Sequence, residues 1–188
     1  MSTNPESSRS SPRARQKLDT LLPADALRRR VTELAAEIDR HYDGREILLV
    51  VVLKGAFVFA ADLIRCLQTP LRVEFVRVES YGDGTRANHD VQLTAGVREP
   101  VQEREILIVE DIIDTGWSLE FLLNHLWDQG AADVRICALL DKPSRRETEI
   151  EADFVGFVIP DVFVVGYGID CAQRYRNLPD ICALAADD

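Results

Sequence analysis

The fold of this chain is decided by residues 105–119, EILIVEDIIDTGWSL, in which a strand pattern gives way to acids and then to a helix pattern. Residues 106–109 form an unbroken run of apolar, β-favouring side chains, which predicts a strand buried on both faces of a parallel sheet. Glu110, Asp111 and Asp114 follow this run. Because ligands of open α/β sheets bind at the carboxyl ends of the strands, we expect a binding site here.

The turn that follows the acids suits a phosphate. A glycine-containing turn that leads into a helix presents free backbone N–H groups, which bind anions. Neighbouring carboxylates accept hydrogen bonds from sugar hydroxyls and can hold a hydrated Mg²⁺. The competing explanation is that the acids only mark the point where the chain reaches solvent. Three acids beside Thr115, Gly116 and Ser118 favour a site for a phosphorylated sugar.

Strand and helix patterns alternate on both sides of this stretch, which predicts an α/β protein with a mostly parallel sheet. A loop at residues 79–90, rich in Gly, Asp and Asn, predicts a mobile hairpin lid, and two short β-like segments near the C-terminus predict a small subdomain above the strand ends. The other predicted elements are strands at 47–53, 71–78, 91–97 and 134–140, helices at 23–42 and 57–67, a helical stripe at 119–126 ended by Gly130, and the C-terminal segments 154–160 and 162–170.

Length and composition narrow the classes of function. The 188 residues, 46% of them hydrophobic, predict a single domain at 18–188 after a flexible polar tail at 1–17. No apolar run approaches the roughly 20 residues of a membrane helix and the start is polar, so we expect a cytoplasmic protein without membrane contact. The four cysteines and three histidines lack the spacing of a disulfide framework or a zinc site. A net charge of −10 disfavours a nucleic-acid partner.

Five separate segments together resemble the 6-oxopurine phosphoribosyltransferases, a group within the type I phosphoribosyltransferase family. They are VVLKGAF (51–57), VESYG (78–82), LIVEDIIDTGWSL (107–119), LLDKPSRR (139–146) and FVVGYGIDCAQRYRNLP (163–179). The resemblance implies the type I phosphoribosyltransferase fold, with helices flanking a central, mostly parallel sheet. It also implies a small hood built from the N-terminal segment and residues from about 154 to 188.

The resemblance further implies a purine salvage transferase. Such an enzyme moves the phosphoribosyl group from phosphoribosyl pyrophosphate to N9 of hypoxanthine, or also of guanine, and forms IMP or GMP and pyrophosphate. The implied cofactor is Mg²⁺, the implied partners are phosphoribosyl pyrophosphate and a 6-oxopurine base, and the implied assembly is a homodimer or homotetramer.

By the same resemblance, Asp114 is the general base that takes a proton from the N7 side of the purine, and its alternative role is to cap the following helix. Glu110 and Asp111 bind the ribose hydroxyls and Mg²⁺, while Asp170 holds Mg²⁺ on the pyrophosphate side. The 5′-phosphate is implied to lie in a loop made of Asp114, Thr115, Gly116, Trp117, Ser118 and Leu119.

Lys54 and Gly55 resemble the family's pyrophosphate loop, in which the Leu53-Lys54 peptide can be cis. Arg176 is implied as a further contact to pyrophosphate, and an arginine suits a polyanion. Without the family match, Lys54 would be explained as a charge placed where a buried strand reaches the surface.

The remaining implied roles concern the purine and the lid. Lys142 follows the strand at 134–140, so its ammonium lies at the same edge and can donate to the purine O6. Phe163 would stack on the purine and Val164 would read its edge through the backbone, although both would otherwise be taken for core residues. Ser80 and Tyr81 begin the lid, whose closure would keep water from an activated ribose.

Three rival hypotheses stay open from the sequence. The acceptor could be adenine, xanthine or a pyrimidine, although Lys142 and Phe163 argue against adenine and pyrimidines. A nucleotide-sensing regulator of the same fold could bind RNA or DNA, but Asp114 and the acidic charge argue against it. A dinucleotide-binding oxidoreductase is disfavoured because the pattern G-x-G-x-x-G is absent.

Overall fold

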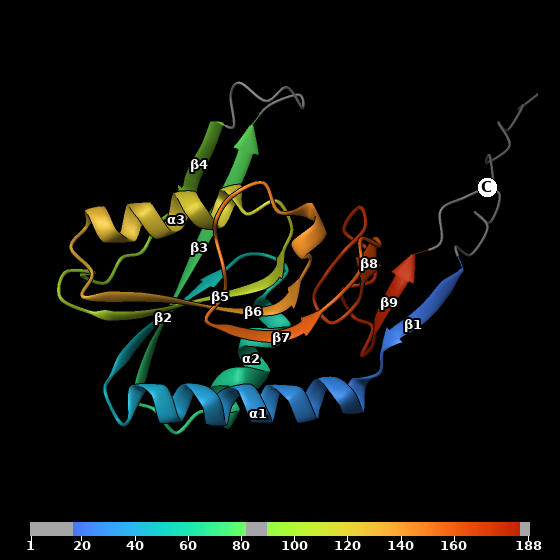
Figure 1. The fold of residues 1–188 in the computed structure, drawn as a ribbon, viewed down its shortest axis with the longest axis horizontal. Coiled ribbons are helices and arrows are strands. Elements are labelled where there is room, and N and C mark those ends of the chain that lie inside the picture. The colour runs from blue at the N-terminus through green and yellow to red at the C-terminus, as the bar shows by residue number, and fades with distance from the viewer. Residues whose placement is uncertain (1–16, 82–89, 185–188) are drawn as a thin grey trace, which may run out of the picture.

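A six-stranded sheet forms the centre of the molecule in the computed structural model, which describes residues 17–81 and 90–184 (Figure 1). Its strand order is β4-β3-β2-β5-β6-β7, and all neighbouring strands are parallel except β3 and β4, which form an antiparallel hairpin. The strands are β2 (Ile47–Val52), β3 (Leu71–Tyr81), β4 (Asp90–Ala95), β5 (Glu105–Ile113), β6 (Asp133–Asp141) and β7 (Phe154–Val158).

Helices cover both faces of this sheet. Helices α1 (Ala24–Tyr42) and α2 (Phe57–Cys66) lie on one face and α3 (Trp117–Asp128) on the other, as Figure 1 shows. Side chains alternate along a strand, and in β2 Leu49 and Val51 pack with α1 and α2, while Leu48 and Val50 pack with α3. Every residue of β2 is buried, because both faces of the strand meet a helix layer.

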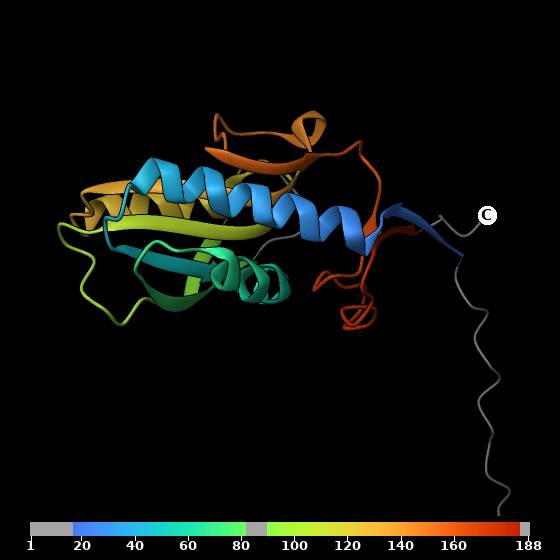
Figure 2. The same cartoon turned by 90° about the horizontal axis from the view of Figure 1, so that it is seen from below.

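A second sheet lies beyond the carboxyl ends of the central strands (Figure 2). Its order is β1-β9-β8, with β1 (Leu18–Leu22) and β8 (Val164–Val165) each antiparallel to β9 (Ile181–Leu184). The N-terminal segment therefore joins the C-terminal segment here, as the predicted hood requires. The prediction was wrong for residues 154–158, because β7 pairs with β6 and extends the central sheet.

Several predicted boundaries shift for reasons of pairing. The strand predicted at 106–109 continues to Ile113 because the ladder between β5 and β6 runs on, with Glu110 opposite Ala138 and Ile112 opposite Leu140. The strand predicted at 71–78 reaches Tyr81 through its pairing with β4, which confirms the hairpin. The lid itself, residues 82–89, lies outside the described residues.

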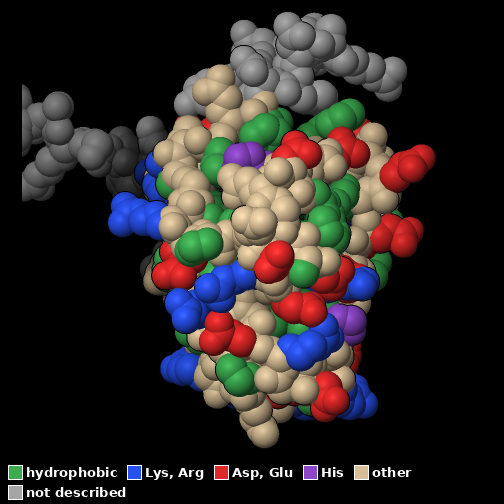
Figure 3. Space-filling view, turned by 90° about the vertical axis from the view of Figure 1, so that its left-hand side faces the viewer, with side chains coloured by type: hydrophobic (Ala, Val, Ile, Leu, Met, Phe, Trp, Pro, Cys, Tyr) green, Lys and Arg blue, Asp and Glu red, His purple; other side chains and the backbone are tan. Residues whose placement is uncertain are grey.

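The amino ends of the central strands carry paired charges. Arg72 forms ion pairs with Glu46 and Glu99, and Arg104 pairs with the same Glu46. Figure 3 faces this end of the molecule and shows acidic and basic side chains intermixed on it. Within the described part of the chain, no helix is both long enough and apolar enough to span a membrane.

Candidate active site

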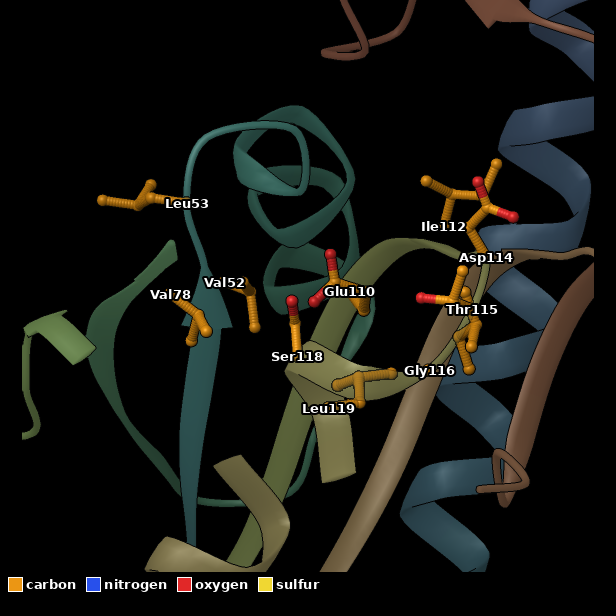
Figure 4. Close-up of a pocket in the computed structure, with 11 residues that line it drawn as sticks. Val52, Leu53, Val78, Glu110, Ile112, Asp114, Thr115, Gly116, Ser118 and Leu119 are labelled. Carbon is orange, nitrogen blue, oxygen red and sulfur yellow. The ribbon is translucent and has the colours of Figure 1, made fainter. Parts of the chain in front are cut away.

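A cavity of about 210 Å³ opens at the carboxyl ends of β2, β3 and β5, beside the start of α3 (Figure 4). This is the edge at which the sequence places its acids and its phosphate-binding turn. The cavity is lined by Val52, Leu53, Val78, Glu110, Ile112, Ile113, Asp114, Thr115, Gly116, Ser118 and Leu119.

The turn between β5 and α3 is shaped for an anion. Gly116 has a φ of +96°, a conformation that glycine adopts without strain. A Cβ atom at Gly116 would overlap the hydroxyl of Thr148, so the turn also needs glycine for space. No side chain of the described residues caps α3, which leaves its first N–H groups available to a ligand. Thr115 and Ser118 add hydroxyls to the same cavity.

Glu110 and Asp111 form a half-buried pair of acids on β5. Burial, reinforced by the charge of Asp111, raises the pKa of Glu110 well above its ordinary value, and the Glu110 carboxyl hydrogen-bonds to Asp111. Burial also raises the pKa of Asp111, opposed by that bond and by the backbone N–H groups of Asp111 and Ile112. Burial thus disfavours the ionised form of both carboxyl groups, and the charge of a bound divalent cation would favour it. Two adjacent carboxylates are also the oxygen ligands that such a cation prefers.

The turn after β2 packs against these acids. The Leu53-Lys54 peptide is cis, as the family resemblance suggested. Gly55 lies so close to Asp111 that a Cβ atom there would overlap the carboxylate, and a Cβ atom on Gly168 would overlap the carbonyl of Gly55. Lys54 itself is exposed. Glycine at 55 and 168 thus lets three backbone segments approach one acid.

Arg176 links the C-terminal loops to the packed segments around Gly55 and Asp111. Its guanidinium donates to the carbonyl of Gly168 (2.7 Å) and pairs with Asp170 (2.6 Å). Its positive charge lowers the pKa of Asp111 and so opposes the effect of burial. Asp170 also accepts the backbone N–H of Gln173 (2.7 Å). Among the described residues, no group of three His, Cys, Asp or Glu side chains could by itself hold a metal ion.

The groups predicted to meet the purine follow β5, β6 and β7 along the chain. Lys142 is only 6% exposed, and its backbone N–H donates to the carbonyl of Ile113 (3.0 Å), which fixes it beside the end of β5. Asp114 accepts a hydrogen bond from Nε of Arg145 (3.1 Å), which raises the pKa of the guanidinium. Phe163 is 55% exposed although apolar, as a stacking residue requires, and Val164 is buried in the second sheet.

The predicted lid residues are only partly described. Ser80 and Tyr81 end β3 and pair with β4, but their side chains, like residues 82–89, lie outside the described part of the structure. Arg145 and Asp161, which lie beside Asp114 and Lys142, are not among the predicted site residues. The available signal was their position, since each follows a central strand (β6 or β7) toward the carboxyl edge.

Comparison with known proteins supplies the family. A model of the phosphoribosyl transferase domain matches residues 17–172, which is most of the chain. The chain belongs to the phosphoribosyltransferase family. The predicted family and the predicted type I fold are thereby confirmed.

Named relatives of this phosphoribosyltransferase are similar over most of their length. A hypoxanthine phosphoribosyltransferase of Haemophilus influenzae is 46% identical over 164 residues, covering 86% of this chain and 92% of that protein. A hypoxanthine-guanine phosphoribosyltransferase of Bacillus subtilis is 45% identical, covering 87% and 91%. The crystal structure of a hypoxanthine-guanine phosphoribosyltransferase from Bacillus anthracis superposes with a TM-score of 0.87 at 44% identity, covering 91% of this chain and all of that one.

Proposed function

We propose that this phosphoribosyltransferase joins hypoxanthine, and also guanine, to the phosphoribosyl group of phosphoribosyl pyrophosphate. The products are IMP or GMP and pyrophosphate. The observation that carries this proposal is the placement of Lys142, a buried cation beside the end of β5, next to a cavity built for a phosphorylated sugar. The relatives named hypoxanthine and hypoxanthine-guanine phosphoribosyltransferases support it.

The sugar phosphate occupies the cavity of Figure 4. The start of α3, with Thr115 and Ser118, binds the 5′-phosphate, and backbone N–H groups from Asp114 to Leu119 complete the cradle. Glu110 and Asp111 accept hydrogen bonds from the ribose hydroxyls and would hold Mg²⁺ through their carboxylates. When bound, Mg²⁺ neutralises part of the charge on the pyrophosphate.

The pyrophosphate lies toward the turn after β2. The backbone at Lys54 and Gly55 faces it, Arg176 adds a cation, and Asp170 would hold a second Mg²⁺ on that side. Two observations support this part of the proposal: the Arg176 guanidinium pairs with Asp170, and its positive charge lowers the pKa of Asp111.

The purine lies between Phe163 and the end of β5. Phe163 stacks on its face, Lys142 donates to O6, and the backbone of Val164 contacts its edge. As N9 forms its bond to ribose C1′, the bond from C1′ to the pyrophosphate oxygen breaks and pyrophosphate leaves with the electron pair. Asp114 accepts the proton from N7, which keeps the purine neutral.

Two further parts belong to the proposal. Ser80 and Tyr81 carry a lid that closes over the sugar and excludes water. Two copies of the chain associate through an apolar surface that includes Phe57 and Phe75, which are 43% and 49% exposed in the single chain.

The test is a panel of acceptors. Purified protein is mixed with Mg²⁺, phosphoribosyl pyrophosphate and, in turn, hypoxanthine, guanine, xanthine, adenine and a pyrimidine, and the nucleotide product is measured. We expect turnover with hypoxanthine and guanine and almost none with adenine. A preference for adenine or a pyrimidine would contradict the base assignment, and no turnover with any base would contradict the proposed activity.

A further inference from the structure

Four charged side chains form a chain of alternating sign beside the purine position. Nε of Arg145 is 3.1 Å from Oδ1 of Asp114 and 3.9 Å from Oδ1 of Asp161. Nζ of Lys142 is 3.9 Å from the same oxygen of Asp161. The order is therefore Asp114, Arg145, Asp161 and Lys142, and the two ends are the general base and the O6 donor of the proposed reaction.

These four residues come from three segments that meet at the carboxyl edge. Asp114 follows β5, Lys142 follows β6, and Arg145 ends the short 3-10 helix Pro143–Arg145. Asp161 lies in the connection from β7 to β8. One Asp161 oxygen thus lies between two cations held by the β6–β7 connection, and it links that connection to the loop that carries Phe163.

Burial differs sharply along the chain of charges. The side chain of Lys142 is only 8% exposed, whereas those of Arg145, Asp114 and Asp161 are each about half exposed. A buried ammonium is costly unless a carboxylate accompanies it, and Asp161 is its acidic neighbour here. The exposed pairs, by contrast, contribute little to stability. The arrangement is therefore better explained by orientation of the site than by stabilisation of the fold.

The two ends of the chain must act on neighbouring atoms of one base, because O6 and N7 share an edge of the purine. An ammonium and a carboxylate placed to reach adjacent atoms would attract each other, and a direct pair would withdraw both from the ligand. Lys142 and Asp114, both described, form no such pair in the structure, since each has its own partner of opposite charge.

We propose that Asp161 is a positioning residue for phosphoribosyl transfer, and this inference rests on the proposed function. Its carboxylate holds the ammonium of Lys142 toward the purine O6. Through Arg145 it also holds Asp114 in place. Asp114 and Lys142 are thereby kept apart until the purine binds. Asp161 acts through these two neighbours and does not itself take part in proton transfer.

The test measures kcat and KM separately for hypoxanthine and phosphoribosyl pyrophosphate in the Asp161→Asn variant, which keeps the side-chain shape and removes the charge. We expect kcat/KM for hypoxanthine to fall by roughly 10- to 100-fold, the cost of lost placement, with little change in KM for phosphoribosyl pyrophosphate. Arg145→Ala should show the same pattern and Arg145→Lys, which keeps the charge, should recover part of the activity.

Arg72→Ala is the matched control. Arg72 is 50% exposed, against 48% for Arg145, and it also has two acidic neighbours, but it lies at the amino ends of the strands. This variant should behave as the wild type. Combining Asp161→Asn with Arg145→Ala should cost little more than the worse single change, because both break one chain.

The outcomes separate the two claims. If the wild type turns over hypoxanthine and the Asp161→Asn variant has the same kcat/KM, the inference is overturned while the proposed function stands. The inference is also overturned by a KM for phosphoribosyl pyrophosphate that rises as much as the KM for hypoxanthine, which points to general damage, or by a double variant whose losses in kcat/KM multiply. A wild-type protein that turns over no base would overturn the proposed function and the inference with it.

Discussion

Gly55 lies directly against the carboxylate of Asp111, so closely that a single added methyl group would overlap three of its atoms. The same glycine is backed by Gly168 from the C-terminal loops. The turn after β2, the acid on β5 and the C-terminal segment are therefore packed at backbone distance. This close approach is what brings Arg176 within electrostatic reach of Asp111.

Gly55→Ala should consequently weaken sugar binding. The backbone at Gly55 is not in the left-handed region, so the expected damage comes from displacing Asp111. We expect KM for phosphoribosyl pyrophosphate to rise by about 10- to 100-fold, from the loss of placement. Gly96→Ala is the control, because a Cβ there would meet only the flexible end of Leu93 at 3.1 Å. Equal kinetics for the two variants would contradict the role of this contact.

Asp114→Asn tests the general base. The amide keeps the shape of the side chain and removes the proton acceptor, so kcat should fall by roughly 10² to 10⁴ while binding of phosphoribosyl pyrophosphate persists. Steady-state kinetics and direct titration of phosphoribosyl pyrophosphate measure the two quantities. Near-normal turnover in this variant would remove Asp114 from the role.

Lys142 should decide which purines are accepted. An ammonium has only donors, so it pairs with O6 but opposes the 6-amino group of adenine. Sites built around such a bond can reject the wrong analogue by roughly 10⁴ to 10⁵. Lys142→Ala should cut kcat/KM for hypoxanthine and leave the affinity for phosphoribosyl pyrophosphate nearly unchanged. If the variant keeps full activity with hypoxanthine, O6 is recognised elsewhere.

Glu110 should make stability depend on pH. Burial raises its pKa well above the ordinary value of 4.5 in the folded protein. At a pH between these two values, the folded state therefore holds a proton that the unfolded state has released. Stability is therefore expected to fall as pH rises from the ordinary pKa to the raised one. Glu110→Gln removes this loss and should raise Tm near neutral pH while weakening the binding of phosphoribosyl pyrophosphate. Thermal unfolding across this pH range checks it, with Glu99→Gln, at a partly exposed acid, as control. Parallel curves for wild type and Glu110→Gln would refute it.

The apolar surface near Phe75 should control assembly. Phe75 on β3 is in register with Val51 on β2, so it shares the sheet face that α2 covers, yet it is 49% exposed. Phe75→Asp should shift the protein toward the monomer in sedimentation velocity. Trp127→Asp is the control, since Trp127 is 42% exposed but lies on α3, across the sheet. Identical sedimentation of both variants and the wild type would place the contact elsewhere.

Local patterns were enough to locate most of the elements. Residues 106–109 and β2 are apolar runs of strand length, and α1 has an apolar face at helical spacing. Each of these patterns predicts its element without reference to distant residues. The C-terminal segments were harder. FVGFV reads as a short strand, but its membership of the central sheet depends on its pairing with β6, which no local pattern encodes.

The sequence by itself determined the fold class, the family and the edge at which the site lies, because motif spacing and side-chain periodicity are properties of neighbouring residues. It also named Glu110, Asp111, Asp114 and Lys142 as candidates. Only the tertiary structure decided that β1 pairs with β9, that Gly55 touches Asp111, and that Arg145 and Asp161 join Asp114 to Lys142. These contacts connect segments far apart along the chain, so their geometry exists only once the strands have taken their order in the sheet.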